Sequence, residues 1–283
     1  MKLLRYGKKG EEKPGILDGE GRIRSLAGHV ADIDGALLAT GLDAIRALDI
    51  ASLPLVAAAD ARRLAEPVAR VGKFLCIGLN YRDHAAEAGQ AVPSEPVLFT
   101  KATSAIMGPN DDILLPPTSV KSDWEVELGV VIGKEARYVP LDQAMDHVAG
   151  LCVVNDLSER EYQLERAGQW DKGKGCDTFG PFGPWLVTLD EIADVGALGM
   201  WLDVNGERMQ TGSTATMVFD VPYLIHYVSQ FMSLQPGDII STGTPPGVGM
   251  GKTPPTFLKE GDVVALGIDG LGEQRQQVRR YGQ

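Results

Sequence analysis

Two acidic residues, spaced as neighbours on one face of a β-strand, are the first candidates for a chemical role. Glu125 and Glu127 lie in residues 124–132, an apolar run whose first part alternates charged and aliphatic side chains. Strand side chains repeat every two residues, so both carboxylates are expected on one face, opposite Val126 and Leu128. A divalent cation between them would remove their repulsion, and carboxylate oxygens favour Mg²⁺, Mn²⁺ or Ca²⁺ over zinc. An exposed strand with a polar outer face is the alternative interpretation.

A third carboxylate, Asp156, follows the apolar residues 148–154, which are expected to form another strand. Functional side chains often gather where a strand ends and a loop or helix begins. The position therefore suits a third metal ligand. The alternative is that Asp156 is the N-cap of a following helix, and for an isolated residue at this position that interpretation is the favoured one.

A histidine and a glutamate follow the first strand expected after residue 70. His84 and Glu87 are three residues apart, so a short helix would present them on one face. A carboxylate beside an imidazole orients the ring and raises its basicity, as a general base for water requires. Residues 90–95 contain Pro93 and no periodicity, which suits a mobile lid. A surface helix with an incidental pair is the alternative.

Basic and amide side chains follow Asp156. Arg160, Gln163 and Lys174 could pair with the carboxylate of an acidic substrate beside a metal. Taken singly, such residues are more often ordinary surface groups. The nearby glycine-rich residues 244–253 do not form a phosphate-binding loop, because proline stands where that motif needs glycine and Pro254 and Pro255 forbid the helix that must follow.

The elements that must position these groups are mostly strands. From about residue 70, short apolar runs alternate with Gly, Pro, Asp and Asn, a pattern typical of a β-rich domain. One helix is expected from Asp220, with Pro222 in its first turn and an apolar stripe along it. We therefore predict a catalytic domain at residues 70–283. The expected strands are residues 74–79, 124–132, 148–154, 185–187, 200–204, 238–242 and 263–268.

Residues 1–66 differ from the rest of the chain in composition and hydrophobic pattern, and they are predicted to form a small N-terminal domain. Residues 15–26 have the pattern of a hairpin around an Asp-Gly turn. Residues 37–47 and 58–65 are rich in Ala, Leu and Asp with loose helical spacing. No catalytic constellation is apparent in this part of the chain.

The overall composition narrows the function classes. The 283 residues carry a net charge of −11, which disfavours nucleic acid and anionic membranes as partners. No apolar run approaches the ~20 residues of a membrane span, and the start of the chain lacks the apolar core of a signal peptide. The three cysteines are scattered and odd in number, so a disulfide framework is not expected and a cytoplasmic location is.

Taken in order, these segments resemble the fumarylacetoacetate hydrolase family over nearly all of residues 70–280. One segment alone would carry little weight, whereas the ordered series is specific. The segments that carry the resemblance are residues 78–81 with His84 and Glu87, 96–101, 125–128, Asn155 and Asp156 with Arg160, Lys174 before 177–179, 183–184, 204–206, 236–238 and 242–245.

The resemblance implies a β-rich α+β fold, a pseudo-barrel of mixed β-sheets with short helices, usually as a homodimer, with a Mg²⁺ or Mn²⁺ site. Carried over by position, the metal ligands would be Glu125, Glu127 and Asp156. The resemblance assigns the remaining matched positions three roles. His84 and Glu87 would activate water, Lys174 would stabilise the enolate or oxyanion, and Arg160, Gln163 and Thr244, with Tyr81 as a looser match, would lie near the substrate.

Residues 158–179 are similar to the branch of the family that acts on 2,4-diketo-3-deoxy sugar acids. The expected activity is therefore metal-dependent hydrolysis of a C–C bond in a 2,4-diketo acid, either an acylpyruvate or such a sugar acid, to pyruvate and a carboxylic acid. Related alternatives are decarboxylation, isomerisation of hydroxymuconate-type acids and ureidoglycolate lyase activity. A non-catalytic ligand-binding protein is the alternative from another class of function. The presence of the expected general base, His84 with Glu87, and of Lys174 argues against it.

Overall fold

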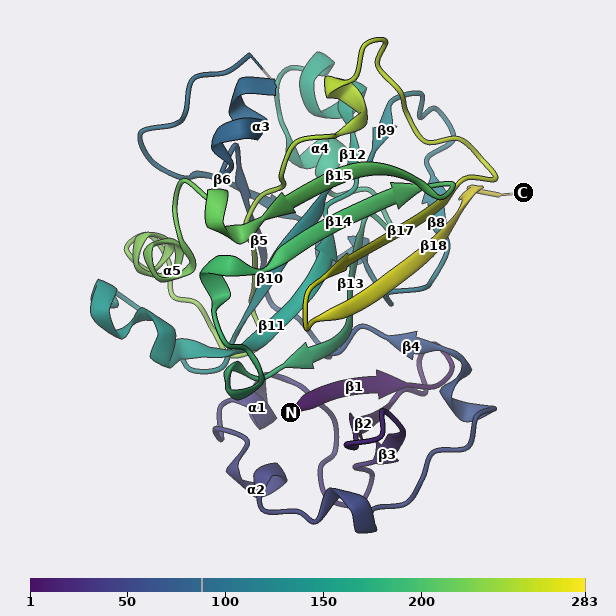
Figure 1. The fold of residues 1–283 in the computed structure, drawn as a ribbon, viewed down its shortest axis with the longest axis vertical. Helices are drawn as coiled ribbons and strands as arrows, with labels where there is room; N and C mark the ends of the chain where they lie inside the picture. Colours follow the sequence, from purple (N-terminus) through teal and green to yellow (C-terminus); the bar gives the residue numbers. More distant parts are fainter. Residues whose placement is uncertain (88, 283) are drawn as a thin grey trace.

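The computed structural model describes residues 1–87 and 89–282. Ala88, at the end of the predicted histidine–glutamate segment, and Gln283, at the end of the predicted catalytic domain, lie outside the described residues. Short strands and short helices make up the chain (Figure 1). The helices are α1 (Gly35–Leu38), α2 (Asp43–Arg46), α3 (Arg82–Glu87), α4 (Asp171–Lys174) and α5 (Val221–Ser229).

The largest sheet has eleven strands, with the central order β3-β2-β1-β13-β11-β10-β16-β5-β6 and with β4 and β7 paired beside that path. It contains antiparallel pairs together with parallel pairs such as β16 with β5. Its strands are β1 (Lys2–Tyr6), β2 (Lys13–Leu17), β3 (Ile23–Ser25), β4 (Leu64–Ala65), β5 (Phe74–Gly78), β6 (Val97–Lys101), β7 (Ile106–Met107), β10 (Val126–Ile132), β11 (Val148–Asn155), β13 (Gly180–Val187) and β16 (Ile239–Ser241).

A second sheet of five strands packs against the large one, in the order β15-β14-β17-β18-β8. The main core lies between the two sheets and includes Val126, Leu128 and Val130 from β10 together with Leu202 and Leu266 from the second sheet. A two-stranded pair, β9 with β12, stands apart. These strands are β8 (Ile113–Leu115), β9 (Ser122–Asp123), β12 (Ser158–Glu159), β14 (Gly199–Val204), β15 (Glu207–Ser213), β17 (Val263–Ile268) and β18 (Gly272–Arg280).

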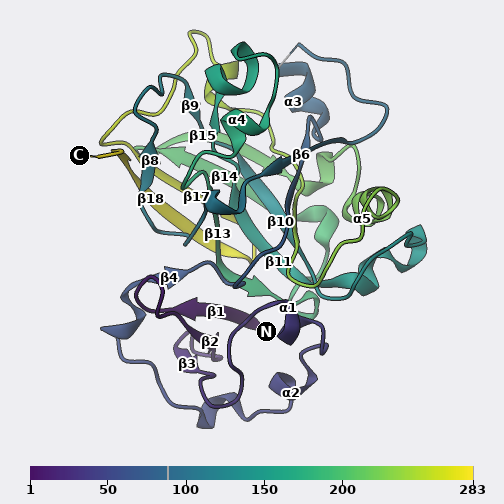
Figure 2. The ribbon, with the colours of Figure 1, turned by 180° about the vertical axis from the view of Figure 1, so that it is seen from behind.

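The N-terminal segment packs on the other face of the large sheet. Its apolar side chains, among them Ile33 and Ile45, share a second core with Val131 and Cys152 of β10 and β11. Strand β1 also pairs antiparallel with β13, so the small N-terminal sheet continues the large one. Figure 2 shows this segment at the end of the molecule opposite α3 and α4.

Most of the predicted elements form, with changes at their ends. The hairpin of residues 15–26 is present as β2 and β3, and the Asp220 side chain caps α5 by accepting the N–H of Tyr223 at 2.9 Å. The helical interpretation of residues 58–65 is wrong at its end. Asp60–Arg62 forms a turn of 3-10 helix, but Leu64–Ala65 forms β4 and pairs with β1. Strands β6, β15 and β18 were not predicted. Polar residues interrupt the apolar pattern of β15 and β18, and β6 has an apolar run of only three residues.

Candidate metal centre and active site

The three predicted metal ligands meet where two neighbouring strands join. Strands β10 and β11 are antiparallel, so Glu125, immediately before β10, lies beside Asp156, immediately after β11. The N–H of Asp156 donates to the carbonyl of Glu125 at 2.9 Å. One carboxylate oxygen from each of Glu125, Glu127 and Asp156 lies within 4.8 Å of the others. All three are buried, which excludes the interpretation of this strand as an exposed polar face.

Asp156 does not cap a helix. Its segment continues as β12, which pairs with β9, and the next helical residues belong to a π-helix at Glu161–Glu165. The side chain of Asp156 instead accepts from two lysines. Lys174 donates to it at 2.8 Å and Lys101 at 2.5 Å. The expectation of a helix starting at this position was therefore wrong, and the tertiary partners explain why an aspartate stands there.

Lys174 lies between two of the carboxylates. Its Nζ donates to Glu125 at 2.6 Å and to Asp156 at 2.8 Å. Burial alone would lower the pKa of Lys174, but Asp156 and Glu125 outweigh that effect and raise it. Lys174 is therefore a permanent buried cation at the centre of the acidic cluster. The structure thus places Lys174 beside the carboxylates of the cluster.

Arg160 closes the cluster from the other side. Its Nη2 donates to Glu125 at 2.6 Å, its Nε to Asp123 at 2.8 Å and its Nη1 to Gln163 at 3.1 Å. Burial by itself would raise the pKa of Glu125, but Lys174 and Arg160 hold it below its usual range. Each nitrogen of the guanidinium thus donates to a protein group, and Arg160 acts first as the partner that orients Glu125.

Two residues of the cluster were missed by sequence reasoning. Asp123 accepts the guanidinium of Arg160 and also the N–H groups of Gly249 and Met250, at 2.6 and 3.0 Å. Lys101 donates to Asp156 and to the carbonyl of Leu157 at 2.9 Å, with no exposed side-chain surface. In the sequence each looks like an ordinary charged surface residue. The signal that could have found them is their position, because Asp123 lies just before the matched residues 125–128 and Lys101 ends the matched residues 96–101.

Glu127 provides the test of whether a cation fits this site. Among the described residues it pairs with no lysine or arginine, and instead accepts from the Ser241 hydroxyl at 2.5 Å and the Gly243 N–H at 3.0 Å. Burial, followed by the charges of Asp156 and Glu125, raises its pKa well above the usual value. A hard divalent cation held by these three carboxylates would offset the repulsion between their negative charges. The all-oxygen donor set suits Mg²⁺, Mn²⁺ or Ca²⁺. The residues present therefore fit such an ion.

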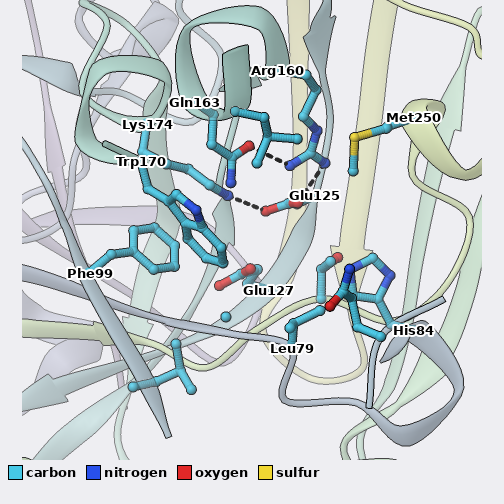
Figure 3. Close-up of a pocket in the computed structure, with 15 residues that line it drawn as sticks. Leu79, His84, Phe99, Glu125, Glu127, Arg160, Gln163, Trp170, Lys174 and Met250 are labelled. Carbon is cyan, nitrogen blue, oxygen red and sulfur yellow. Dashed lines mark hydrogen bonds and ion pairs between the residues drawn. The ribbon is translucent and has the colours of Figure 1, made fainter. Parts of the chain in front are cut away.

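The predicted histidine–glutamate pair forms on α3. His84 Nδ1 lies 3.0 Å from Glu87 Oε2, and Glu87 also accepts the N–H of Gly247 at 2.9 Å. A neutral imidazole that donates through Nδ1 keeps a lone pair on Nε2, so this pair can act as a general base. Figure 3 shows the His84 ring across the cavity from Lys174 and Trp170.

One cavity of about 250 Å³ connects the carboxylates with His84 (Figure 3). Thr244 lines it, with its hydroxyl donating to the carbonyl of Val126 at 2.9 Å. Tyr81 does not belong to its lining. This tyrosine is buried in the main core, where its hydroxyl donates to the sulfur of Met200 at 3.1 Å. The lining residues are Ile77, Gly78, Leu79, His84, Gln90, Phe99, Glu125, Glu127, Arg160, Gln163, Leu164, Trp170, Lys174, Thr244 and Met250.

Comparison with known proteins places this arrangement in context. The family model described as "Fumarylacetoacetate (FAA) hydrolase C-terminal" matches residues 73–279. A protein of Burkholderia ambifaria named "Putative hydrolase" is 63% identical over 281 residues, which cover 99% of this chain and 99% of that protein.

Two solved structures share the fold over almost the whole chain. The fumarylacetoacetate hydrolase of Exiguobacterium antarcticum is 34% identical, with a TM-score of 0.89 and 99% of each chain covered. The maleylpyruvate hydrolase of Sphingobium sp. SYK-6, in complex with manganese(II) ion and pyruvate, is 30% identical, with a TM-score of 0.81 and 100% of each chain covered. The fold, the matched residues and these identities together establish that the chain belongs to the fumarylacetoacetate hydrolase family.

Proposed function

We propose that this protein is a divalent-metal-dependent hydrolase that cleaves a 2,4-diketo acid between C3 and C4. The observation that carries the proposal is one cavity lined by carboxylates of the acidic cluster and, across from them, by His84 held by Glu87. The reaction adds one water to the substrate. A C4–O bond forms, the C3–C4 bond breaks and C3 takes up one proton of the water, and the products are pyruvate and a carboxylic acid, which releases the other proton to solvent, with no oxidation or reduction.

Glu125, Glu127 and Asp156 would hold the cation, for which Mg²⁺ and Mn²⁺ are the proposed ions. A bound divalent cation supplies a Lewis acid that polarises the keto oxygen of an acidic substrate and offsets its carboxylate charge. The maleylpyruvate hydrolase described above carries manganese and pyruvate, the kind of metal and the product proposed here, and this supports the assignment.

The chain supplies the water-activating base. His84 accepts a proton at Nε2 while Nδ1 donates to Glu87, which stabilises the imidazolium that forms. The Gly247 N–H holds Glu87 from the opposite side, so the base does not depend on α3 alone for its orientation. The imidazolium can then return its proton to C3 as the C3–C4 bond breaks.

Lys174 stabilises negative charge on the departing three-carbon fragment. Because its raised pKa keeps it protonated, it acts as a fixed cation and not as a base. Gln163 accepts from Arg160 through its side-chain oxygen and lines the cavity, so its amide nitrogen is available to a substrate oxygen. These two groups would orient the keto acid beside the carboxylates.

A product assay tests the proposal. Purified protein is freed of metal, supplied with Mg²⁺ or Mn²⁺, and incubated with acylpyruvates, 2,4-diketo-3-deoxy sugar acids, oxaloacetate, a hydroxyheptadienedioate and ureidoglycolate. We expect pyruvate and the matching acid from a 2,4-diketo acid, in equal amounts and only with metal. Release of CO₂, an isomerised product, or glyoxylate as the main product would instead assign decarboxylase, isomerase or ureidoglycolate lyase activity and would overturn the proposal.

A further inference from the structure

The part of the cavity beyond the carboxylates has an aromatic wall. Phe99 and Trp170 form it with an edge-to-face contact, their ring centroids 5.3 Å apart. The Nζ of Lys174 lies 4.9 Å from the centroid of Phe99, so the wall begins directly beside the acidic cluster. Figure 3 shows both rings on the same side of the cavity.

Gly78 makes room for this wall. A Cβ at Gly78 would lie 2.7 Å from the Trp170 ring, closer than real contacts allow. Any side chain at position 78 would therefore push the indole out of its place against Phe99. The indole position depends on the absence of a side chain here, which indicates that the chain holds Trp170 at a defined place on the cavity wall.

The opposite wall is also apolar. Leu79 and Met250 lie there on the side of His84, and Leu164 also lines the cavity (Figure 3). Leu79 has φ of 53°, a left-handed backbone conformation that is uncommon for a residue other than glycine. Met250 is held by its N–H, which donates to the buried carboxylate of Asp123 at 3.0 Å.

The cations at the cavity have protein partners already. Among the described residues that line it, Arg160 and Lys174 are the permanently charged ones, and both pair with carboxylates of the cluster. Residues 88–96, which connect α3 to β6, contain neither lysine nor arginine. Lys252 follows Met250 closely in sequence but does not line the cavity. A second carboxylate on the substrate would therefore enter an apolar space without an opposite charge, which is costly.

We infer that the substrate is a 2,4-diketo acid with a single carboxylate, whose acyl end is uncharged, apolar and held between Trp170 with Phe99 and Leu79 with Met250. This inference rests on the proposed function and narrows it to acylpyruvates with alkyl or aryl groups, in preference to sugar acids and dicarboxylic acids. Trp170 is the residue that sets the preference, because it combines the largest apolar surface with a position fixed by Gly78.

Steady-state kinetics with Mn²⁺ tests the inference on three compounds, which are acetylpyruvate, benzoylpyruvate and succinylpyruvate. For the wild type we expect kcat/KM to be at least about tenfold higher for benzoylpyruvate than for succinylpyruvate, the size of effect that a few apolar contacts give. Trp170→Ala should lower kcat/KM for benzoylpyruvate about tenfold, mostly through KM, and Trp170→Phe should restore much of it. The same variants should leave acetylpyruvate within about threefold, because its methyl group does not reach far along the wall.

The exposed aromatic Phe231 provides the control, since Phe231→Ala removes a ring that is 63% exposed and does not line the cavity. Equal or greater activity on succinylpyruvate, or an equal loss on acetylpyruvate and benzoylpyruvate in Trp170→Ala, would overturn the inference. A protein that cleaves a 2,4-diketo-3-deoxy sugar acid but none of the three would likewise overturn the inference, whereas a protein that cleaves no 2,4-diketo acid at all disproves the proposed function instead. In that case calorimetric binding of phenylpyruvate and 2-oxoglutarate with Mn²⁺ still decides the inference, which requires tighter binding of phenylpyruvate and its loss in Trp170→Ala.

Discussion

Arg160 joins Asp123 to Glu125. Its Nε donates to Asp123 at 2.8 Å and its Nη2 donates to Glu125 at 2.6 Å, with all three side chains buried. Asp123 also accepts the N–H groups of Gly249 and Met250. One buried aspartate that would not touch the metal therefore fixes both a proposed metal ligand and a loop of the cavity wall.

Asp123→Asn should weaken metal binding through this relay. The amide keeps the shape of the side chain but removes the charge that holds Arg160, so Glu125 loses its orientation. We expect the Kd for Mn²⁺ to rise about tenfold, the lower end of the effect seen when partners of metal ligands are replaced. Isothermal titration of the metal-free protein measures this. Asp112→Asn, at an exposed aspartate paired with Arg279, is the matched control, and equal Kd values in both variants would contradict the relay.

Glu127→Gln should separate metal binding from stability. Burial, followed by the charges of Asp156 and Glu125, raises the pKa of Glu127, so a negative charge at this position is costly in the metal-free protein and a neutral amide avoids that cost. We expect the Tm of metal-free protein to rise by about 2–4 °C, as ~1 kcal/mol gives in a protein of this size class. The further rise on adding Mn²⁺ should be lost. Thermal melts with and without metal check both, and a lower Tm of the metal-free variant, or an undiminished rise on adding Mn²⁺, would contradict the prediction.

His84→Asn should remove the proposed base without removing the metal site. The asparagine cannot take a proton from water, and we expect kcat to fall about 10²–10⁴-fold, the usual contribution of a general base. The Kd for Mn²⁺ should stay within about twofold, because the carboxylate that His84 contacts among the described residues is Glu87, which is not one of the three proposed metal ligands. Glu87→Gln should lower kcat less, since the ring remains. A His84→Asn enzyme with wild-type kcat would remove this residue from the mechanism.

Cys176 should react slowly with thiol reagents and respond steeply to pH. Burial raises the pKa of its thiol to about 11, so most of it is protonated at pH 8. Only the thiolate reacts, and alkylation by iodoacetamide should therefore speed up about tenfold per pH unit between pH 8 and 10. Mass spectrometry of the native protein follows the labelling. Cys76 and Cys152 are fully buried and should stay unlabelled, and a Cys176 rate that levels off near pH 9 would contradict the prediction.

Several elements followed from local pattern alone. The alternation around Val126 and Leu128 predicts β10, and Asp220 with Pro222 predicts the start of α5, because strand periodicity and helix capping are written in neighbouring residues. Strand β18 was not predictable in this way. Its inward residues include Gln274 and Gln276, whose buried amides bond to backbone carbonyls of distant segments, so the apolar signal is missing.

In the part of the chain that the structure describes, no helix is long and apolar enough to cross a membrane.

The site divides in the same way. The order of motifs along the chain predicts Glu125, Glu127, Asp156, His84 and Lys174 as site residues, because their types and spacing can be read directly from the sequence. The tertiary structure alone decided that Asp123 and Lys101 belong to the cluster, that Arg160 is committed to protein carboxylates, and that Tyr81 lies in the core. These properties depend on which side chains, distant in sequence, come together in a buried space, because a buried charge without a partner is costly. The local sequence pattern does not show which distant side chains will be neighbours.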